Sequence, residues 1–254
     1  MFEEILPVSK RRKYINPMYF RDSMHLARFI HEDNDAGLGE YLDSFFDMRD
    51  LHIIDKLFIC LTARKLFIDD KIRLKGTSDI DIPIHLMLNK LKSKSEERVY
   101  DVNGLKLTCD IPNRFSFIDI SSECIKSVHA LNTTINLREL DDESRDLVIS
   151  KLPSGALRIV HEYIRSLSPV CKLLDARPKM GLDEISINLL STDPITFVKL
   201  MFSDYSLNYF RESIVLLGQT IGTEMISYST LADVRFYLDE ISRNNSSGKA
   251  DIPL

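Results

Sequence analysis

The sequence contains little glycine, and this shortage limits the folds and sites that it can form. Only nine glycines occur among the 254 residues, which is roughly half of the usual share. This number disfavours a turn-rich β sandwich. It also disfavours an enzyme that holds phosphate groups with several glycine-rich loops. We therefore expect helices to dominate the fold.

Cysteine is also scarce, and its spacing excludes two common kinds of site. Cys60, Cys109, Cys124 and Cys171 lie far apart, and none belongs to a Cys-x-x-Cys pair. Neither a zinc ribbon nor a dithiol redox motif is present. Buried free thiols are the simplest interpretation, and they fit a reducing cytosol.

Long apolar runs and an excess of positive charge are missing as well. The N-terminus has no apolar signal segment, and charges interrupt every apolar run before the ~18 residues of a membrane span. We therefore expect a protein that is neither secreted nor membrane-spanning. Lys and Arg total 33 against 38 acidic residues, and the net charge of −5 gives no general attraction to nucleic acid or anionic membranes.

The hydrophobic pattern divides the chain into helical ends and a strand-rich middle. Apolar residues recur at helical spacing in residues 16–66 and 143–243, whereas alternation marks residues 71–120. Asn16-Pro17 resembles a helix start, with proline at the first helical position. The sequence predicts an α+β fold that is predominantly helical, with a small, mainly antiparallel sheet in the middle of the chain.

The clearest local pattern in the middle segment is a β hairpin around Asn103-Gly104. These two residues tolerate the positive φ angles that a type I′ turn requires, and Leu105, Leu107 and Cys109 alternate after them. Two further short strands are predicted earlier, where Ile72 alternates with Arg73 and Ile80 alternates with Asp81.

We expect one α+β domain over residues 16–243, between an N-terminal arm of residues 1–15 and a flexible polar tail of residues 244–254. The arm contains the basic run Lys-Arg-Arg-Lys at positions 10–13. This run could bind phosphate or an acidic partner surface, but a solvated arm is the simpler interpretation. In the C-terminal half, we expect an apolar helix face to pack on the core rather than on a neighbour, namely Leu207, Phe210, Ile214 and Leu217.

One pair of carboxylates is the sharpest candidate for chemistry. Asp79 and Asp81 are two residues apart on a predicted strand, so both point to one face, where they could share Mg²⁺ as in nucleotidyltransferases. That family places a Gly-Ser helix start upstream, and this chain has Arg64-Lys65 in that region without Gly-Ser. A strand with a solvated acidic face is therefore our preferred interpretation.

The histidines form no recognisable catalytic or metal motif. No His-Glu-x-x-His spacing occurs, and none has an obvious nucleophile partner. The six are His25, His31, His52, His85, His129 and His161. No glycine-rich phosphate loop or Ser-His-Asp signature occurs either, so the residues predict no catalytic, cofactor or metal site and no enzyme.

The order of segments resembles the baseplate hub subunits and hub assembly proteins of T4-like contractile-tailed bacteriophages. Residues 16–22 look like the opening helix of that family, and residues 102–107 look like its hairpin. The likeness covers residues 16–243 and is carried by these segments: 16–22, 50–66, 71–75, 79–82, 102–107, 111–112, 191–197 and 204–217. Some relatives have a cysteine pair between the early strands, where this chain has Gly76-Thr77-Ser78, so no metal site is implied.

The resemblance implies a non-enzymatic structural component or assembly factor of the baseplate hub, acting through contacts with other hub and tail proteins. It implies the host cytoplasm during assembly, and it leaves open whether the protein stays in the virion baseplate and whether it forms a homo-oligomer. No individual functional residue is carried over. The alternatives are an intracellular adaptor that uses the basic N-terminal arm, and a nucleotidyltransferase that uses Asp79 and Asp81.

Overall fold

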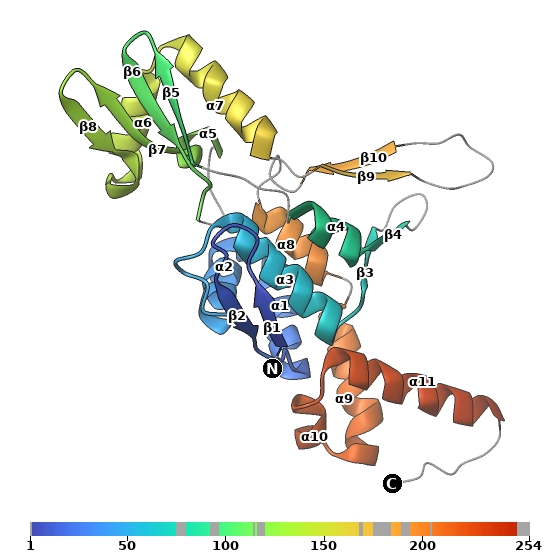
Figure 1. Ribbon diagram of the computed structural model, residues 1–254. Coiled ribbons are helices and arrows are strands. Elements are labelled where there is room, and N and C mark those ends of the chain that lie inside the picture. Colours follow the sequence, from blue (N-terminus) through green and yellow to red (C-terminus); the bar gives the residue numbers. More distant parts are fainter. Residues whose placement is uncertain are drawn as a thin grey trace.

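The described residues form a predominantly helical α+β fold with small antiparallel sheets, as the sequence predicts (Figure 1). The computed structural model describes residues 2–74, 80–91, 97–113, 115, 120–167, 170–174, 184–188, 194–203 and 205–247. The large buried apolar side chains belong to one continuous cluster that extends from Leu6 to Val234. Three groups of elements contribute to it: a central helical body, a sheet with its own helices, and a C-terminal set of helices.

The central body is built around helix α3, which packs against α4 and α8. It consists of β1 (Phe2–Ile5), β2 (Arg12–Ile15), α1 (Phe20–His31), α2 (Asp35–Phe45), α3 (Ile53–Phe67), β3 (Lys71–Leu74), β4 (Ile80–Pro83), α4 (Ile84–Leu91) and α8 (Pro194–Phe202). The predicted strands around Ile72 and Ile80 are confirmed, and they pair antiparallel with Ile72 opposite Ile82. Both of these isoleucines are buried, because alternation places them on the side that faces the helices.

A four-stranded antiparallel sheet projects from this body (Figure 1). Its elements are β5 (Arg98–Val102), β6 (Leu105–Cys109), α5 (Ile120–Cys124), β7 (Ile125–Ala130), β8 (Thr133–Asn136), a 3₁₀ turn (Leu137–Glu139), α6 (Asp142–Ser150) and α7 (Ser154–Leu167). The strand order is β5-β6-β7-β8, and α7 lies against β5 and β6. The predicted turn is confirmed: Asn103 and Gly104 have φ angles of 55° and 84°.

Main-chain hydrogen bonds join the sheet to the central body through residues 110–113 and Phe115. The Ile53 N–H donates to the Pro112 carbonyl at 2.7 Å, and the Ile195 N–H donates to the Phe115 carbonyl at 3.0 Å. On the sheet side, Arg138 pairs with Asp110 at 3.1 Å. The connecting segment is therefore held from both sides, and helix starts in two distant parts of the sequence depend on it.

The C-terminal half contains a further antiparallel pair of strands and three further helices. These elements are β9 (Val170–Leu174), β10 (Glu184–Asn188), α9 (Leu207–Ile221), α10 (Thr223–Ser227) and α11 (Leu231–Ser247). The predicted inward face of α9 is confirmed, since Phe210 and Leu217 are buried and Leu207 and Ile214 pack against the core. Helix α11 extends to Ser247, so residues 244–247 belong to a helix and not to the expected flexible tail; residues 248–254 lie outside the described part.

The expected N-terminal arm is a β hairpin instead. Leu6 and Ile15 are buried at its two sides, and the carboxylate of Asp55 accepts hydrogen bonds from the N–H groups of Val8 and Ser9 in its turn, at 2.8 and 3.0 Å. The prediction was wrong because the basic run at 10–13 hides the alternation, and because the buried acceptor lies 47 residues away from Val8.

The predicted start of the first helix also differs. Helix α1 begins at Phe20 rather than at Pro17, and the Tyr19 N–H donates to the Asp22 carboxylate at 3.0 Å just before it. The Phe20 N–H bonds to the Ser229 carbonyl, so a distant segment fixes this end of the helix. Helix α2 begins at Asp35, and the Asn34 side chain caps it by accepting the Gly37 N–H.

Helix α3 carries three charged side chains that are almost completely buried. Asp55, Lys56 and Arg64 are 0%, 1% and 0% exposed. Lys56 binds both carboxylate oxygens of Asp43 at 2.7 Å, and although burial lowers the pKa of Lys56, Asp43 opposes that shift. Arg64 donates to the carbonyls of Lys71, at 3.0 Å, and Met201. Each buried charge thus connects α3 to a different neighbouring segment.

Replacing Arg64 with alanine is expected to lower the free energy of unfolding by about 3 kcal/mol, because two buried carbonyls lose their donor. Urea unfolding followed by circular dichroism measures this change. The control is Lys65→Ala, one residue further along the same helix and exposed, which is expected to change stability by less than about 0.5 kcal/mol. Equal stabilities of the two variants would show that Arg64 does not hold these segments together.

Candidate functional site

A polar pocket of about 380 Å³ lies between the β3–β4 hairpin and the helices α9 and α11. Charged side chains and tyrosines dominate its walls. The lining residues are Asp69, Lys71, Arg73, Asp81, Tyr205, Tyr209, Arg235, Leu238 and Asp239. Segments that are more than a hundred residues apart in the sequence therefore contribute to one surface, which makes this pocket the main candidate site.

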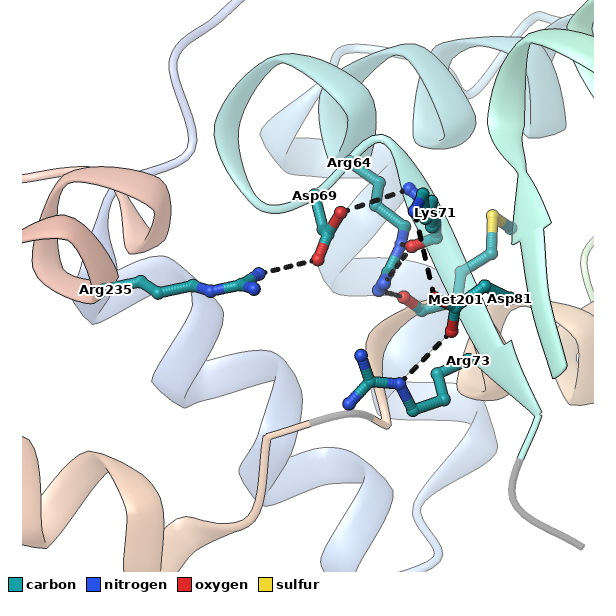
Figure 2. Close-up of polar contacts among 7 residues, drawn as sticks. All are labelled: Arg64, Asp69, Lys71, Arg73, Asp81, Met201 and Arg235. Carbon is teal, nitrogen blue, oxygen red and sulfur yellow. Dashed lines mark hydrogen bonds and ion pairs between the residues drawn. The ribbon is translucent and has the colours of Figure 1, made fainter. Parts of the chain in front are cut away.

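The hairpin positions one wall of the pocket by its register. Arg73 on β3 lies directly opposite Asp81 on β4, and their side chains form an ion pair at 3.2 Å (Figure 2). Lys71 approaches the same carboxylate at 3.8 Å. Directly opposite residues point to one face of an antiparallel pair, so this pairing follows from the strand register alone.

The opposite wall is joined to the hairpin by Asp69 and Arg235. The guanidinium of Arg235, on α11, lies 2.7 Å from the Asp69 carboxylate, which also accepts the Lys71 N–H at 3.2 Å (Figure 2). Burial raises the pKa of Asp69, but the hydrogen bond and charge of Arg235 outweigh this effect and hold the pKa below its usual value. Asp69 is therefore ionised when the two walls are joined.

Two tyrosines of α9 and its preceding turn form the apolar part of the pocket. The rings of Tyr205 and Tyr209 lie 4.7 Å apart, and burial is the main cause of the raised pKa of each phenol. Beneath this wall, Arg64 bonds to the carbonyls of Lys71 and Met201 (Figure 2). The buried arginine thus supports β3 and the end of α8, from which the two walls start.

The pocket is a network of paired charges rather than a set of open ligands. Asp81 pairs with Arg73 within the hairpin wall. Asp69 pairs with Arg235 of the opposite wall. Among the described residues, no group of three His, Cys, Asp or Glu side chains is arranged to hold a metal ion. The direct effect of these ion pairs is to link the C-terminal helices to the β3–β4 hairpin, through Arg235 and Asp69.

The structure places the two predicted carboxylates differently. Asp81 lies in the pocket wall, half-exposed and bound to Arg73, whereas Asp79 lies outside the described residues. The structure thus shows Asp81 in an ion pair, and it does not test whether both carboxylates share one face. The sequence motif did not reveal the cation opposite Asp81, although alternation in β3 and β4 permits that pairing.

The other candidate residues are distributed over the fold. In the basic run, Arg12 lies 3.6 Å from Glu3 and Lys13 lies 2.8 Å from Asp47, so both face acidic groups of their own chain. His52 contacts the Ile111 carbonyl and His129 contacts the Thr134 hydroxyl. None of these residues lines the polar pocket.

Three of the four cysteines are buried free thiols, as predicted. Cys60, Cys109 and Cys124 have this state, and burial raises the pKa of Cys109 to about 12 and that of Cys60 still further. Both remain protonated thiols at neutral pH, which makes them poor nucleophiles. The side chain of Cys171 lies outside the described part.

Sequence reasoning missed Asp69 and Arg235, which join the two walls. They are 166 residues apart, and neither belongs to a motif, so no local signal pointed to them.

No described helix is both long and apolar enough to cross a membrane. Comparisons with family models, with curated proteins and with solved structures gave no match.

The pKa of Asp69 is lower in the folded protein than in the unfolded chain, where it is about 3.9. The ion pair with Arg235 is therefore expected to stabilise the fold fully at pH values above the unfolded pKa. This stabilisation is lost as the pH falls through the folded pKa. Asp69→Asn should therefore lower the free energy of unfolding, measured by urea titration near neutral pH, by less than about 1 kcal/mol for this partly exposed pair. It should have no effect in strong acid.

The matched control for this titration is Asp239→Asn, which changes another carboxylate of the same pocket. No ion pair of Asp239 is found among the described residues. We expect this variant to change the stability near neutral pH less than Asp69→Asn does. A constant difference between Asp69→Asn and the wild type, from neutral pH to strong acid, would contradict the assignment of the stabilisation to the Asp69 charge.

Proposed function

We propose that this protein is a non-enzymatic component or assembly factor of a bacteriophage baseplate hub, acting through contacts with other hub and tail proteins. The order of segments supports the family assignment. The observation that carries the mode of action is a set of large apolar side chains left exposed on the C-terminal helices. These side chains are Val215, Leu216, Met225, Tyr228 and Phe236, each more than half exposed.

Tyr228 directly follows α10, and the other four residues lie on helices that already bury another face. In α9, Phe210 and Leu217 point into the core, whereas Val215 and Leu216 are 65% and 58% exposed. In α11, Val234 is buried and Phe236 is 60% exposed. A helix that is apolar on both faces exposes more than folding requires, and exposed apolar surface is typical of protein contact sites.

The position of these helices supports the same role. Figure 1 shows α9, α10 and α11 at one end of the molecule, away from the four-stranded sheet. The ion pair between Asp69 and Arg235 joins this end to the β3–β4 hairpin. A partner bound at α9–α11 would therefore be held at a defined position relative to the central body.

The two alternative functions have less support from the geometry. A nucleotidyltransferase would use Asp79 and Asp81, but the carboxylate of Asp81 is paired with Arg73. An adaptor would use the basic run as a free arm, but that run is part of a hairpin in which Lys13 binds Asp47. Asp81 and Lys13 therefore already have partners within the chain.

The proposal is tested by co-expressing the tagged chain with the hub and tail proteins of the virus that encodes it, followed by size-exclusion chromatography and calorimetric titration. We expect a stable complex with at least one of them. Val215→Glu with Leu216→Glu should weaken that complex at least tenfold, about 1.4 kcal/mol, because charges then replace apolar contacts.

The control for this pair is Arg211→Ala with Glu212→Ala, which changes two exposed polar residues of the same helix and should leave binding unchanged. Circular dichroism establishes that both double variants keep the helical fold. If the wild-type chain forms no complex with any hub or tail protein, the proposed function is wrong.

A further inference from the structure

Strand β8 is an open edge of the four-stranded sheet, and its composition is unusual for an edge. It pairs with β7 on one side and ends the sheet order on the other. Its four residues are Thr133-Thr134-Ile135-Asn136, of which the first three are exposed. Among the strands that the structure describes, β8 alone contains no charged residue. Proteins usually protect an edge with charges, with proline or by keeping the strand short; β8 is short but has neither charge nor proline.

The turn that leads into β8 contains a leucine that is exposed to solvent and has a positive φ angle. Leu131 is 92% exposed and has a φ angle of 55°, in a two-residue turn between the paired residues Ala130 and Thr133. Leucine at positive φ is a strained conformation that glycine or asparagine adopts easily. The neighbouring turn of the same sheet has Asn103-Gly104 with positive φ at both residues. Strain and exposure together indicate that Leu131 serves a contact outside the fold.

The register defines which groups of β8 face outward. The pair next to a two-residue turn is hydrogen-bonded, so Ala130 and Thr133 bond to each other and the next pair, His129 and Thr134, does not. The backbone N–H and C=O of Thr134 therefore point away from β7. Ile135 lies on the opposite face of the strand, beside Val128 of the core, and is 37% exposed.

We propose that the edge of β8, together with Leu131, binds an extended segment of another protein, which adds a fifth strand to the sheet. Main-chain hydrogen bonds at Thr134 would hold the segment. One face of it would carry apolar side chains next to Ile135, and the other would carry uncharged polar side chains next to Thr134. Figure 1 shows the β7–β8 turn at the end of the sheet away from the central helices, where such a segment can approach.

An extended segment suits this edge better than a second copy of the chain. A four-residue strand is only about 13 Å long, and a stable interface needs about 800 Å² from each partner. Two rigid copies joined through β8 would bury much less than that. A flexible segment can follow β8 and then continue over Leu131. This inference is independent of the proposed hub function, because it uses only the geometry of the sheet.

The test is to select binders from a displayed library of random decapeptides on the intact chain. We expect enriched peptides in which apolar and uncharged polar residues alternate, with many β-branched side chains. Thr134→Pro removes the outward N–H and should raise their dissociation constant at least tenfold. Thr134→Lys, which keeps that N–H but adds a charge, should weaken binding too and covers the case in which the proline variant does not fold.

Leu131→Gly separates a binding role from a structural one. It should weaken the selected peptides at least threefold while raising the melting temperature by about 2 °C, because the strain at positive φ is relieved. The control Lys106→Gln, exposed on β6 near the same end of the sheet, should change neither quantity.

Four outcomes would overturn the proposal. They are failure to enrich any peptide, equal binding to the wild type and the Thr134 variants, a lowered melting temperature of Leu131→Gly, and a wild-type dimer in sedimentation that Thr134→Pro abolishes. The last outcome would show that a second copy occupies the edge. All four measurements use the chain without any hub protein, so their failure is distinct from failure of the hub proposal.

Discussion

The fold depends on three buried charged side chains of helix α3, each of which must be paired with a polar group of another segment. An unpaired charge in the interior costs several kcal/mol, so Asp55, Lys56 and Arg64 can be buried only where neighbouring segments supply the matching groups. Asp55 binds the turn of the N-terminal hairpin, Lys56 binds Asp43, and Arg64 binds the carbonyls at the start of β3 and the end of α8. These contacts require the segments to be in place together. The apolar residues of α3 provide the burial, and its charges select one arrangement of the helices and hairpins around it.

The strength of the polar contacts decreases from this helix toward the surface. The contacts of Arg64 are buried, whereas the Arg235–Asp69 pair that joins α11 to the hairpin is partly exposed. Surface ion pairs contribute much less than buried ones. The central body is therefore specified by buried polar contacts, whereas the C-terminal helices are held by apolar packing, by the main-chain bond from Phe20 to Ser229 and by this partly exposed ion pair. In the binding mode that we propose, a partner would contact the exposed apolar groups of these helices, such as Val215 and Phe236.

Local patterns predicted the parts of the fold that local chemistry determines. Asn103-Gly104 favoured a tight turn, and the alternation around Ile72 and Ile80 matched the register of β3 and β4. The prediction was wrong where a distant group decides the structure. The N-terminal hairpin depends on Asp55, and the start of α1 depends on the Ser229 carbonyl. In the candidate site, Asp81 was identified but Asp69 and Arg235 were not, because nothing in a sequence window shows that residues so far apart will meet.

The ion pair of Asp81 shows why a motif alone is weak evidence for chemistry. The D-x-D spacing specifies which face of a strand the carboxylates occupy, and a metal site requires that face to be free of competing cations. The partner strand decides this second condition: β3 places Arg73 opposite Asp81, and Lys71 lies on the same side. The same argument applies in reverse to β8. Its four uncharged residues form no motif, yet the order of the sheet leaves their edge open. In both cases the neighbouring strand, and not the residue pattern itself, determines whether a group is available to a ligand.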